Sequence, residues 1–422
     1  MHTKYLTVAL AFFLFVACGQ QAGLAQHAPT WAGSWRSAQQ AACLRDQLPR
    51  QTFSGATLRE TVHLSIGGSQ LRLRLSNLFG QQELALRSVT VARATAGIPG
   101  TIEKGSSITV RFHGATKVTL PAGTESASDA IPLPMQTLSS LTVTMEIDHA
   151  PDCATTHGGA RATSFLQPGS HANDETIGEA ERFAHWYFLS AVDVEADTPQ
   201  RNIVAFGDSI TDGRGATDDA NNRWTDVLAQ RLAPRGIGVL NLGIGGNCVL
   251  HECLGQSGVQ RFERDALNAP ETETIILFEG INDIGGLDRV AEHTQAEHDA
   301  LVESLEHAFT QMAAKAHAHG RRIIGGTLTP FLGSDYYHPS ERTEQDRLKL
   351  NTWIRARSAF DGVIDFDSIL SDPLHPGHLS PEVDSGDHLH PSPEGYRRMG
   401  EGVSINLLIH DNKTRLQSGE HL

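Results

Sequence analysis

Between about residues 57 and 194, apolar and polar residues alternate along the chain. Two alternating runs, at 62–66 and 71–75, flank Gly67 and Gly68, and this pattern predicts a β-hairpin. Further alternating runs, separated by Gly- and Pro-rich turns, occur at 108–112, 118–120 and 141–147. Several short strands without intervening helices predict a β-sandwich of jelly-roll type.

Beyond residue 200 the spacing of the apolar residues along the chain changes. Short apolar strands are predicted at 203–206, 239–242, 274–278, 322–328 and 363–366. Helices are predicted at 223–232, 290–317 and 342–359, with a last helix opening at Pro393. Alternating strands and helices predict a parallel sheet covered by helices on both faces, so that every strand delivers a loop to the same edge.

The chain of 422 residues is long enough for two domains. We expect a signal peptide at 1–25, a β domain at 26–196 and an α/β domain at 197–422, with residues 197–200 as the linker. Apolar residues make up 39% and charged residues 20%, which is typical of globular proteins. The net charge of −15 and the absence of a basic run argue against a nucleic-acid partner.

The first residues have the pattern of an export signal. Lys4 precedes an apolar run at 6–17 that is too short to span a bilayer, and the small residues at 23–25 suit cleavage. Cys18 follows a segment that resembles a bacterial lipoprotein box, so a lipid anchor at Cys18 is the alternative to release of a soluble protein. We expect a secreted or periplasmic protein, and no other segment is a transmembrane candidate.

Export permits disulfides. Without Cys18 four cysteines remain, and the short spacing of Cys248 and Cys253 predicts a local bridge. Cys43 would then pair with Cys153. These spacings match no zinc-ligand pattern, and free buried thiols are the other interpretation.

Four loops at the predicted sheet edge carry distinctive motifs. They are Gly-Asp-Ser at 207–209, Asn-x-x-x-x-Gly at 241–246, Gly-Ile-Asn-Asp at 280–283 and Asp-His-Leu-His-Pro at 387–391. Each one alone can be read as a helix cap or a turn. Together they supply the groups that acyl transfer requires at one place.

A serine hydroxyl is a weak nucleophile at neutral pH and needs an adjacent base, which His390 can provide for Ser209. Asp387 can accept the other ring N–H and so hold the imidazole in one tautomer. An oxyanion can be bound by the Asn282 amide and by the backbone N–H groups of Ser209 and Gly246. We interpret Ser209, His390 and Asp387 as the catalytic residues.

Two alternatives concern the same loops. His388 competes for the role of base, but its spacing from Asp387 and the following Pro391 favour His390. A metal cluster could be drawn from His375, His378, Asp384, Asp387, His388 and His390. No spacing there fixes ligand geometry, so we expect neither metal nor cofactor.

Three further residues are candidates for substrate binding: Asp208, Asn247 and Asp283. For the two carboxylates, fixing the loops by accepting hydrogen bonds is the competing interpretation.

The ordered motifs resemble those of the SGNH, or GDSL, hydrolases over residues 200–410. The resemblance implies a flavodoxin-like three-layer α/β/α fold and metal-free ester hydrolysis. It assigns the nucleophile to Ser209, the oxyanion donors to Ser209, Gly246 and Asn282, and the acid and base to Asp387 and His390. Ile210 stands where leucine is commoner. The N-terminal segment "GGSQLRLRLSNLFG" resembles a subgroup of large secreted bacterial SGNH esterases that are often linked with polysaccharide deacetylation.

The substrate is the least determined feature. The sequence shows no clear apolar lid of the kind expected in a lipase. Export, an acidic surface and an accompanying β domain favour an acetyl ester on an oligo- or polysaccharide. A short-chain lipid esterase or thioesterase, and a non-catalytic carbohydrate-binding protein, are the alternatives. Five aromatic residues could stack on sugars or pack internally: Trp31, Trp35, Trp186, Tyr336 and Tyr337.

Overall fold

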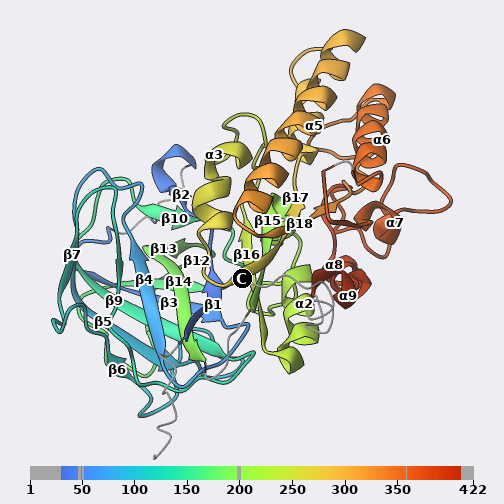
Figure 1. Cartoon of the computed structure of the whole chain (residues 1–422). Helices are drawn as coiled ribbons and strands as arrows, with labels where there is room; N and C mark the ends of the chain where they lie inside the picture. Colours follow the sequence, from blue (N-terminus) through green and yellow to red (C-terminus); the bar gives the residue numbers. More distant parts are fainter. Residues whose placement is uncertain (1–29, 46–48, 50–51, 197–200, 358, 410–422) are drawn as a thin grey trace, which may run out of the picture.

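The computed structural model describes residues 30–45, 49, 52–196, 201–357 and 359–409. The predicted signal peptide, Cys18 and the linker at 197–200 lie outside the described residues. Strands fill the N-terminal region (residues 30–196), and an α/β arrangement follows (Figure 1). In the described part, no helix has both the length and the apolar character needed to span a bilayer.

The N-terminal region consists of three mainly antiparallel sheets, ordered β1-β14-β4-β8, β13-β10-β2 and β12-β11-β3-β9-β5-β6, with β7 also on β5. The strands are β1 (Thr30–Arg36), β2 (Gln40–Ala41), β3 (Ala56–His63), β4 (Leu71–Ser76), β5 (Leu84–Arg93), β6 (Ile108–Thr109), β7 (Val118–Leu120), β8 (Glu125–Ala127), β9 (Ser140–His149), β10 (Thr155–His157), β11 (Ser164–Pro168), β12 (Glu181–Phe183), β13 (Trp186–Tyr187) and β14 (Leu189–Ala196). A short 3₁₀ helix, Ala42–Arg45, follows β2. The predicted strand-rich character is confirmed.

The predicted hairpin at Gly67 and Gly68 is wrong. Strand β3 pairs with β9 and β11, whereas β4 pairs with β14 and β8, so the two strands belong to different sheets. The glycines serve close backbone packing instead of a tight turn. A Cβ on Gly68 would lie 2.4 Å from the carbonyl oxygen of Glu195, a distance that only glycine tolerates.

The C-terminal region (residues 201–409) is built on a five-stranded sheet of order β16-β15-β17-β18-β19. All four pairings are parallel, as predicted. The strands are β15 (Arg201–Gly207), β16 (Ile237–Gly243), β17 (Thr272–Phe278), β18 (Arg322–Gly326) and β19 (Gly362–Ile364). In chain order this arrangement reads 2-1-3-4-5, the order found in flavodoxin-like sheets.

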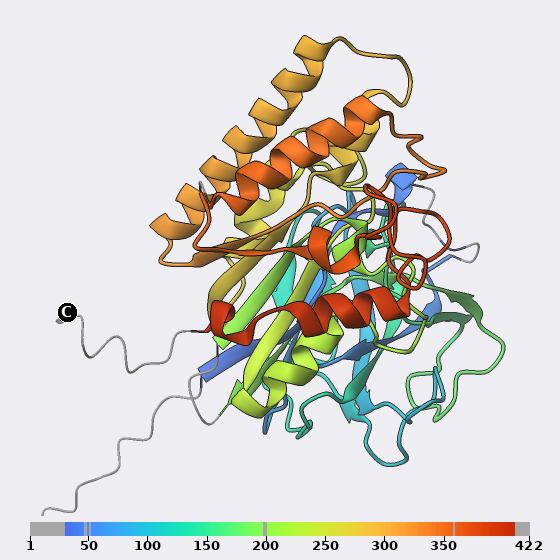
Figure 2. The same cartoon turned by 90° about the vertical axis from the view of Figure 1, so that its right-hand side faces the viewer.

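Two groups of helices cover this sheet. Helices α3, α4, α5 and α6 contact one another on one side, and α2, α7 and α8 do so on the other; Figure 2 shows the sheet between α5 and α6 above and α2 and α8 below. The helices are α1 (Ser209–Asp212), α2 (Trp224–Leu232), α3 (Gly258–Phe262), α4 (Ile281–Leu287), α5 (Gln295–Ala318), α6 (Glu341–Arg355), α7 (Phe366–Leu370), α8 (Pro393–Gly402) and α9 (Ile405–Leu408), with a 3₁₀ turn at Ala233–Arg235 and a π turn at Glu263–Leu267.

Two disulfides are present, Cys43–Cys153 and Cys248–Cys253, and both pairings are those predicted from the spacing. The first ties the 3₁₀ helix after β2 to the loop before β10. The second closes a loop after β16, at the edge of the sheet where the catalytic motifs were expected.

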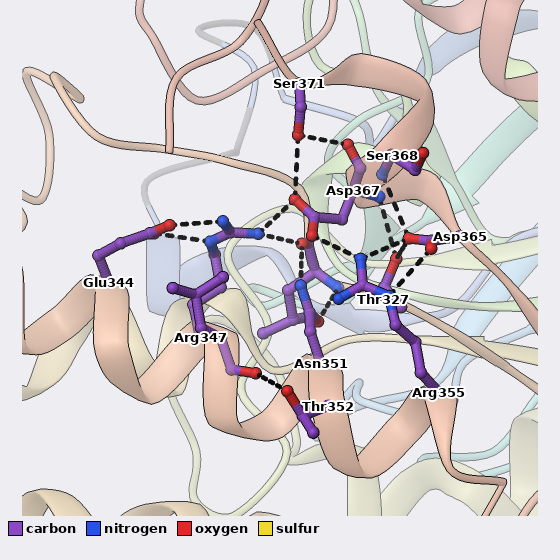
Figure 3. Close-up of polar contacts among 12 residues, drawn as sticks. Thr327, Glu344, Arg347, Asn351, Thr352, Arg355, Asp365, Asp367, Ser368 and Ser371 are labelled. Atoms are coloured by element: carbon purple, nitrogen blue, oxygen red, sulfur yellow. Dashed lines mark hydrogen bonds and ion pairs between the residues drawn. The ribbon is translucent and has the colours of Figure 1, made fainter. Parts of the chain in front are cut away.

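A buried ionic network joins α6 to α7 (Figure 3). The Arg347 guanidinium donates to both carboxylate oxygens of Glu344, at 2.6 and 2.7 Å, and to Asp367 at 2.6 Å. Arg355 reaches Asp365 and the second oxygen of Asp367. Because the Arg347 side chain is buried, removing its charge leaves Glu344 without this partner and leaves Asp367 with Arg355 alone.

We predict that Arg347→Met lowers the free energy of unfolding by about 3–5 kcal/mol, since a buried ion pair loses one member. The matched control is Arg397→Met on α8, whose guanidinium contacts Glu394 and Glu401 at the surface and should contribute little. Urea denaturation of both variants measures the difference. Equal losses would contradict the structural role given to the Arg347 network.

Candidate active site

The loop after β15 presents Ser209 as the first residue of α1. The N-cap is Asp208, whose carboxylate accepts a hydrogen bond from the Ile210 N–H at 2.9 Å. The Ser209 hydroxyl therefore does not cap the helix, and it can hydrogen-bond to another group at the carboxyl edge of the sheet.

Ser209, His390 and Asp387 form one chain of hydrogen bonds. The distance from Ser209 Oγ to His390 Nε2 is 2.8 Å, and the distance from His390 Nδ1 to Asp387 Oδ2 is 2.6 Å. A carboxylate only accepts, so Nδ1 carries the proton and Nε2 is left to accept from the hydroxyl. The three side chains come from two segments far apart in the sequence, the start of α1 after β15 and the loop between α7 and α8.

The charge of Asp387 is stabilised where it stands. Partial burial alone would raise its pKa, but the hydrogen bond and the electrostatic attraction of the His390 ring outweigh that effect, together with the N–H groups of Leu389 and His390. The pKa of Asp387 is consequently well below its ordinary value. The carboxylate stays ionised and can hold the imidazole in one orientation.

His388 lies apart from this chain. Its side chain is 52% exposed, and its Nδ1 pairs with Asp384 at 2.6 Å. Of the two histidines that compete for the role of base, the structure brings His390 to Ser209.

Asn282 lies in the first turn of α4, with its amide held on both sides. The amide nitrogen donates to the carbonyl oxygen of Asn247 at 2.6 Å, and the amide oxygen accepts from the Tyr337 hydroxyl at 2.5 Å. Because the Asn247 carbonyl can only accept, it determines which end of the amide is the donor, and one amide hydrogen remains for another acceptor.

The loop that carries Gly246 is held tightly. Gly246 has a φ of 71°, and a Cβ there would lie 2.3 Å from the Leu254 side chain. The Cys248–Cys253 disulfide closes the following segment. Glycine is required here by both the backbone conformation and the packing.

The three side chains considered for substrate binding are buried within the protein. Asp208 caps α1, and Asp283 accepts from the N–H groups of Val249 and Leu250 at 2.8 and 3.0 Å. The Asn247 amide donates to the carbonyl oxygens of Leu254 and Gln256. These contacts are the ones expected of side chains that fix loops.

Arg261 on α3 lies directly beneath the site and is fully buried. Its guanidinium donates to the carbonyl oxygens of Gly207 and Leu242, both at 2.8 Å, and to the side chain of Asn247 at 2.7 Å. It also covers the Phe206 ring at 3.8 Å from the centroid. One cation thus binds the ends of β15 and β16 and the loop of Gly246.

Glu279 faces Arg261 from the end of β17, with 3.5 Å between Oε1 and Nη2. Within the described residues neither carboxylate oxygen of Glu279 has a hydrogen-bond partner. Burial raises the pKa of Glu279 to about 7, although the charge of Arg261 opposes the shift.

Arg261, Glu279 and Tyr337 were not predicted as site residues. The sequence could have identified Glu279 as a candidate, because it is a lone carboxylate that directly follows the apolar run "IILF". Tyr337 was considered only as a sugar platform. Nothing in the local pattern marks Arg261, whose partners come from elements distant in the sequence.

The aromatic candidates divide by burial. Trp35 and Trp186 pack edge to face with centroids 4.8 Å apart, and Trp31 lies under the Arg72 guanidinium. Tyr337 is also buried. Tyr336 is 49% exposed, packs against Tyr337 and lies under the Arg289 guanidinium, so among the five it is the exposed aromatic ring.

Among the described residues, the one cluster of three or more potential metal ligands is Cys248, His251 and Cys253. Both cysteines are disulfide-bonded and are therefore not available as thiolate ligands. The histidines and aspartates of the 375–390 segment form separate pairs instead, such as His375 with Asp372 and His388 with Asp384.

As a whole, the arrangement can perform nucleophilic acyl transfer. It offers a hydroxyl hydrogen-bonded to an imidazole, a carboxylate that orients the imidazole, and an oriented amide on the neighbouring loop.

Comparison with known proteins agrees with this chemistry. Residues 205–398 match the model of the GDSL-like Lipase/Acylhydrolase family. No curated protein is significantly similar in sequence to the whole chain.

Several solved structures are similar to part of this chain at low identity. A carbohydrate acetylesterase from Sinorhizobium meliloti is 16% identical, covering 47% of this chain and 94% of its own, with a TM-score of 0.37. An aryl esterase from M. smegmatis is 18% identical over 50% of this chain and 100% of its own, also with a TM-score of 0.37. A lipolytic protein of the G-D-S-L family from Desulfitobacterium hafniense is 23% identical over 48% and 96%, with a TM-score of 0.36.

The raised pKa of Glu279 predicts how stability varies with pH. Between its ordinary value of 4.5 and about 7, the unfolded chain loses the proton that the folded chain keeps. The free energy of unfolding should fall over this range as pH rises, by on the order of 3 kcal/mol, and level off above it. Glu279→Gln should remove this component, as measured by urea denaturation across the range.

The control is Glu273→Gln on the same strand, whose carboxylate pairs with Arg201 nearer the surface. It should keep the wild-type slope. If Glu279→Gln also keeps that slope, Glu279 is not protonated in the folded protein at neutral pH.

Proposed function

Since the C-terminal domain belongs to the GDSL-like Lipase/Acylhydrolase family and the protein is a carboxylic ester hydrolase, we propose that Ser209 is its nucleophile. The observation that carries the proposal is the continuous chain of hydrogen bonds from Ser209 through His390 to Asp387. This geometry supports a two-step mechanism through an acyl-enzyme.

In the first step Ser209 Oγ attacks the ester carbonyl while its proton passes to His390 Nε2. The Asp387 carboxylate stabilises the imidazolium that forms. The tetrahedral intermediate collapses, the bond to the alkoxy oxygen breaks, and His390 returns the proton to the departing alcohol. Water then attacks the acyl-enzyme with the same base, which releases the acid and restores the serine.

The oxyanion is bound by the backbone N–H groups of Ser209 and Gly246 and by the Asn282 amide. Support comes from the orientation of that amide, whose oxygen is occupied by the Tyr337 hydroxyl and whose nitrogen keeps one hydrogen free. Donors that are already oriented stabilise developing charge without further reorganisation.

The substrate we propose is a short acyl ester, above all an acetyl ester, on an oligo- or polysaccharide outside the cytoplasm. The tightly packed Gly246 loop leaves little freedom beside the nucleophile, which favours a small acyl group. The exposed ring of Tyr336, next to the Tyr337 that holds Asn282, offers a surface on which a sugar can stack.

Export fits this substrate. We propose that residues 1–25 form the signal peptide, 26–196 an accessory β domain of jelly-roll type, and 197–422 a catalytic domain of flavodoxin-like three-layer architecture. The two disulfides support an oxidising compartment.

Ser209→Ala and His390→Ala should each lower kcat for p-nitrophenyl acetate by on the order of 10⁴-fold or more, because nucleophile and base act as a unit. The matched control is His388→Ala, which removes a neighbouring imidazole that faces solvent and should leave kcat unchanged. Equal losses in the two histidine variants would refute the assignment of the base.

Asn282→Ala should lower kcat by about 10²–10³-fold and leave KM nearly unchanged, because an oxyanion donor acts in the transition state. Steady-state kinetics with the same ester separate the two constants. A raised KM at constant kcat would instead assign Asn282 to ground-state binding.

Acyl-chain profiling tests the substrate class. The wild-type enzyme should hydrolyse acetate esters fastest and release acetate from acetylated glycans, and Tyr336→Ala should raise KM for the glycan more than for the aryl ester. A rate maximum at long acyl chains, with no acetate released from any acetylated glycan, would favour the lipid-esterase alternative.

A further inference from the structure

The helix that begins with Ser209 ends at Asp212, and the Asp212 carboxylate is buried against the N-terminal region. His157 on β10 lies across from it, with Nε2 at 2.9 Å from Asp212 Oδ1. The other ring nitrogen lies 2.9 Å from the carbonyl oxygen of Ala38. Because a carbonyl can only accept, Nδ1 donates to Ala38, and Nε2 shares a hydrogen bond with the Asp212 carboxyl group.

Two neighbours pack closely against this pair. A Cβ on Gly159 would lie 1.9 Å from Asp212 Oδ2, so the chain after β10 passes directly over the carboxylate. The Trp186 indole stacks on the His157 ring at 5.5 Å between centroids. These contacts on both members of the buried pair restrict where the Asp212 carboxyl group can lie.

Arg223 adds a second link between the two regions. Its Nε donates to the carbonyl oxygen of Asp212 at 2.8 Å, and its Nη2 donates to the carbonyl oxygen of Ala160. Both the side chain and the backbone of Asp212 are therefore tied, directly or through one residue, to the segment 157–160 of the N-terminal region.

Asp212 also adjoins the loop of the proposed oxyanion donor Gly246. A Cβ on Gly245 would lie 3.3 Å from Asp212 Oδ2, and one on Gly243 would lie 2.3 Å from the backbone nitrogen of Asp212. A shift of Asp212 would thus displace the start of its own helix, where Ser209 lies, and the adjacent loop of Gly246.

We propose that His157 is a positioning residue for ester hydrolysis, and that the N-terminal region thereby forms part of the catalytic unit. Through Asp212, His157 holds Ser209 in line with His390 and holds the loop of Gly246 beside it. The proposal rests on Ser209 as the nucleophile and is independent of the glycan. Displacement of a reacting group by about 1 Å can cost on the order of 10²-fold in rate.

The test uses the full-length protein and p-nitrophenyl acetate. His157→Ala should lower kcat by about 10–100-fold with little change in KM, because the small ester makes no contact with His157. His157→Gln, whose side-chain amide can still donate one hydrogen bond to Asp212, should recover part of the loss. Asp212→Asn should fall between the wild type and His157→Ala, and it serves as the second variant if His157→Ala does not fold.

The matched control is Ser65→Ala. Ser65 is a buried residue of the N-terminal region whose hydroxyl accepts from the Val239 N–H on β16 at 3.2 Å. It lies at the same junction without contacting α1, so its variant should lose stability but keep kcat. If His157→Ala and Ser65→Ala have the same kcat at a temperature where both are folded, the proposal is overturned.

Inactivation by an organophosphonate separates this proposal from the assignment of the nucleophile. The modified peptide identifies the reactive serine, and the inactivation rate reports how well it is positioned. An adduct away from Ser209 would overturn the mechanism itself. An adduct on Ser209 that forms equally fast in wild type and His157→Ala would overturn the role of His157 alone.

Discussion

The geometry of the site depends on one buried cation, the guanidinium of Arg261. Removing a charge from water is costly unless hydrogen bonds replace the lost hydration, and here they come from Gly207, Leu242 and Asn247. These acceptors lie at the ends of two strands and in the loop of Gly246. Satisfying the cation therefore brings together the segments that carry Ser209 and Gly246.

Much of the C-terminal fold could be predicted because its signals are local. Apolar runs marked every strand of the parallel sheet, and the change from period two to alternating strands and helices located the α/β part. The hairpin at Gly68 failed for a physical reason. An alternating pattern shows that a strand has one buried face but not which strand lies beside it, and β3 and β4 have partners in different sheets.

Part of the candidate site could also be predicted from the sequence. The residues proposed to act on the substrate lie in loop motifs of distinctive composition, and the structure brings Ser209, His390 and Asp387 together. Residues that hold those groups left little trace, because their role comes from contacts between distant segments. His157 is the clearest case: its partner Asp212 belongs to another region of the chain, and no spacing in the sequence connects the two.

The central claim is that hydrolysis proceeds through an acyl group on Ser209, and trapping that intermediate tests it most directly. Wild-type enzyme mixed with excess p-nitrophenyl acetate, quenched in acid within a turnover and digested, should show one acetyl group on the peptide that contains Ser209. Mass spectrometry with fragmentation locates the modified residue. Acetylation of a different residue, or rapid turnover without any acylated peptide, would contradict the account.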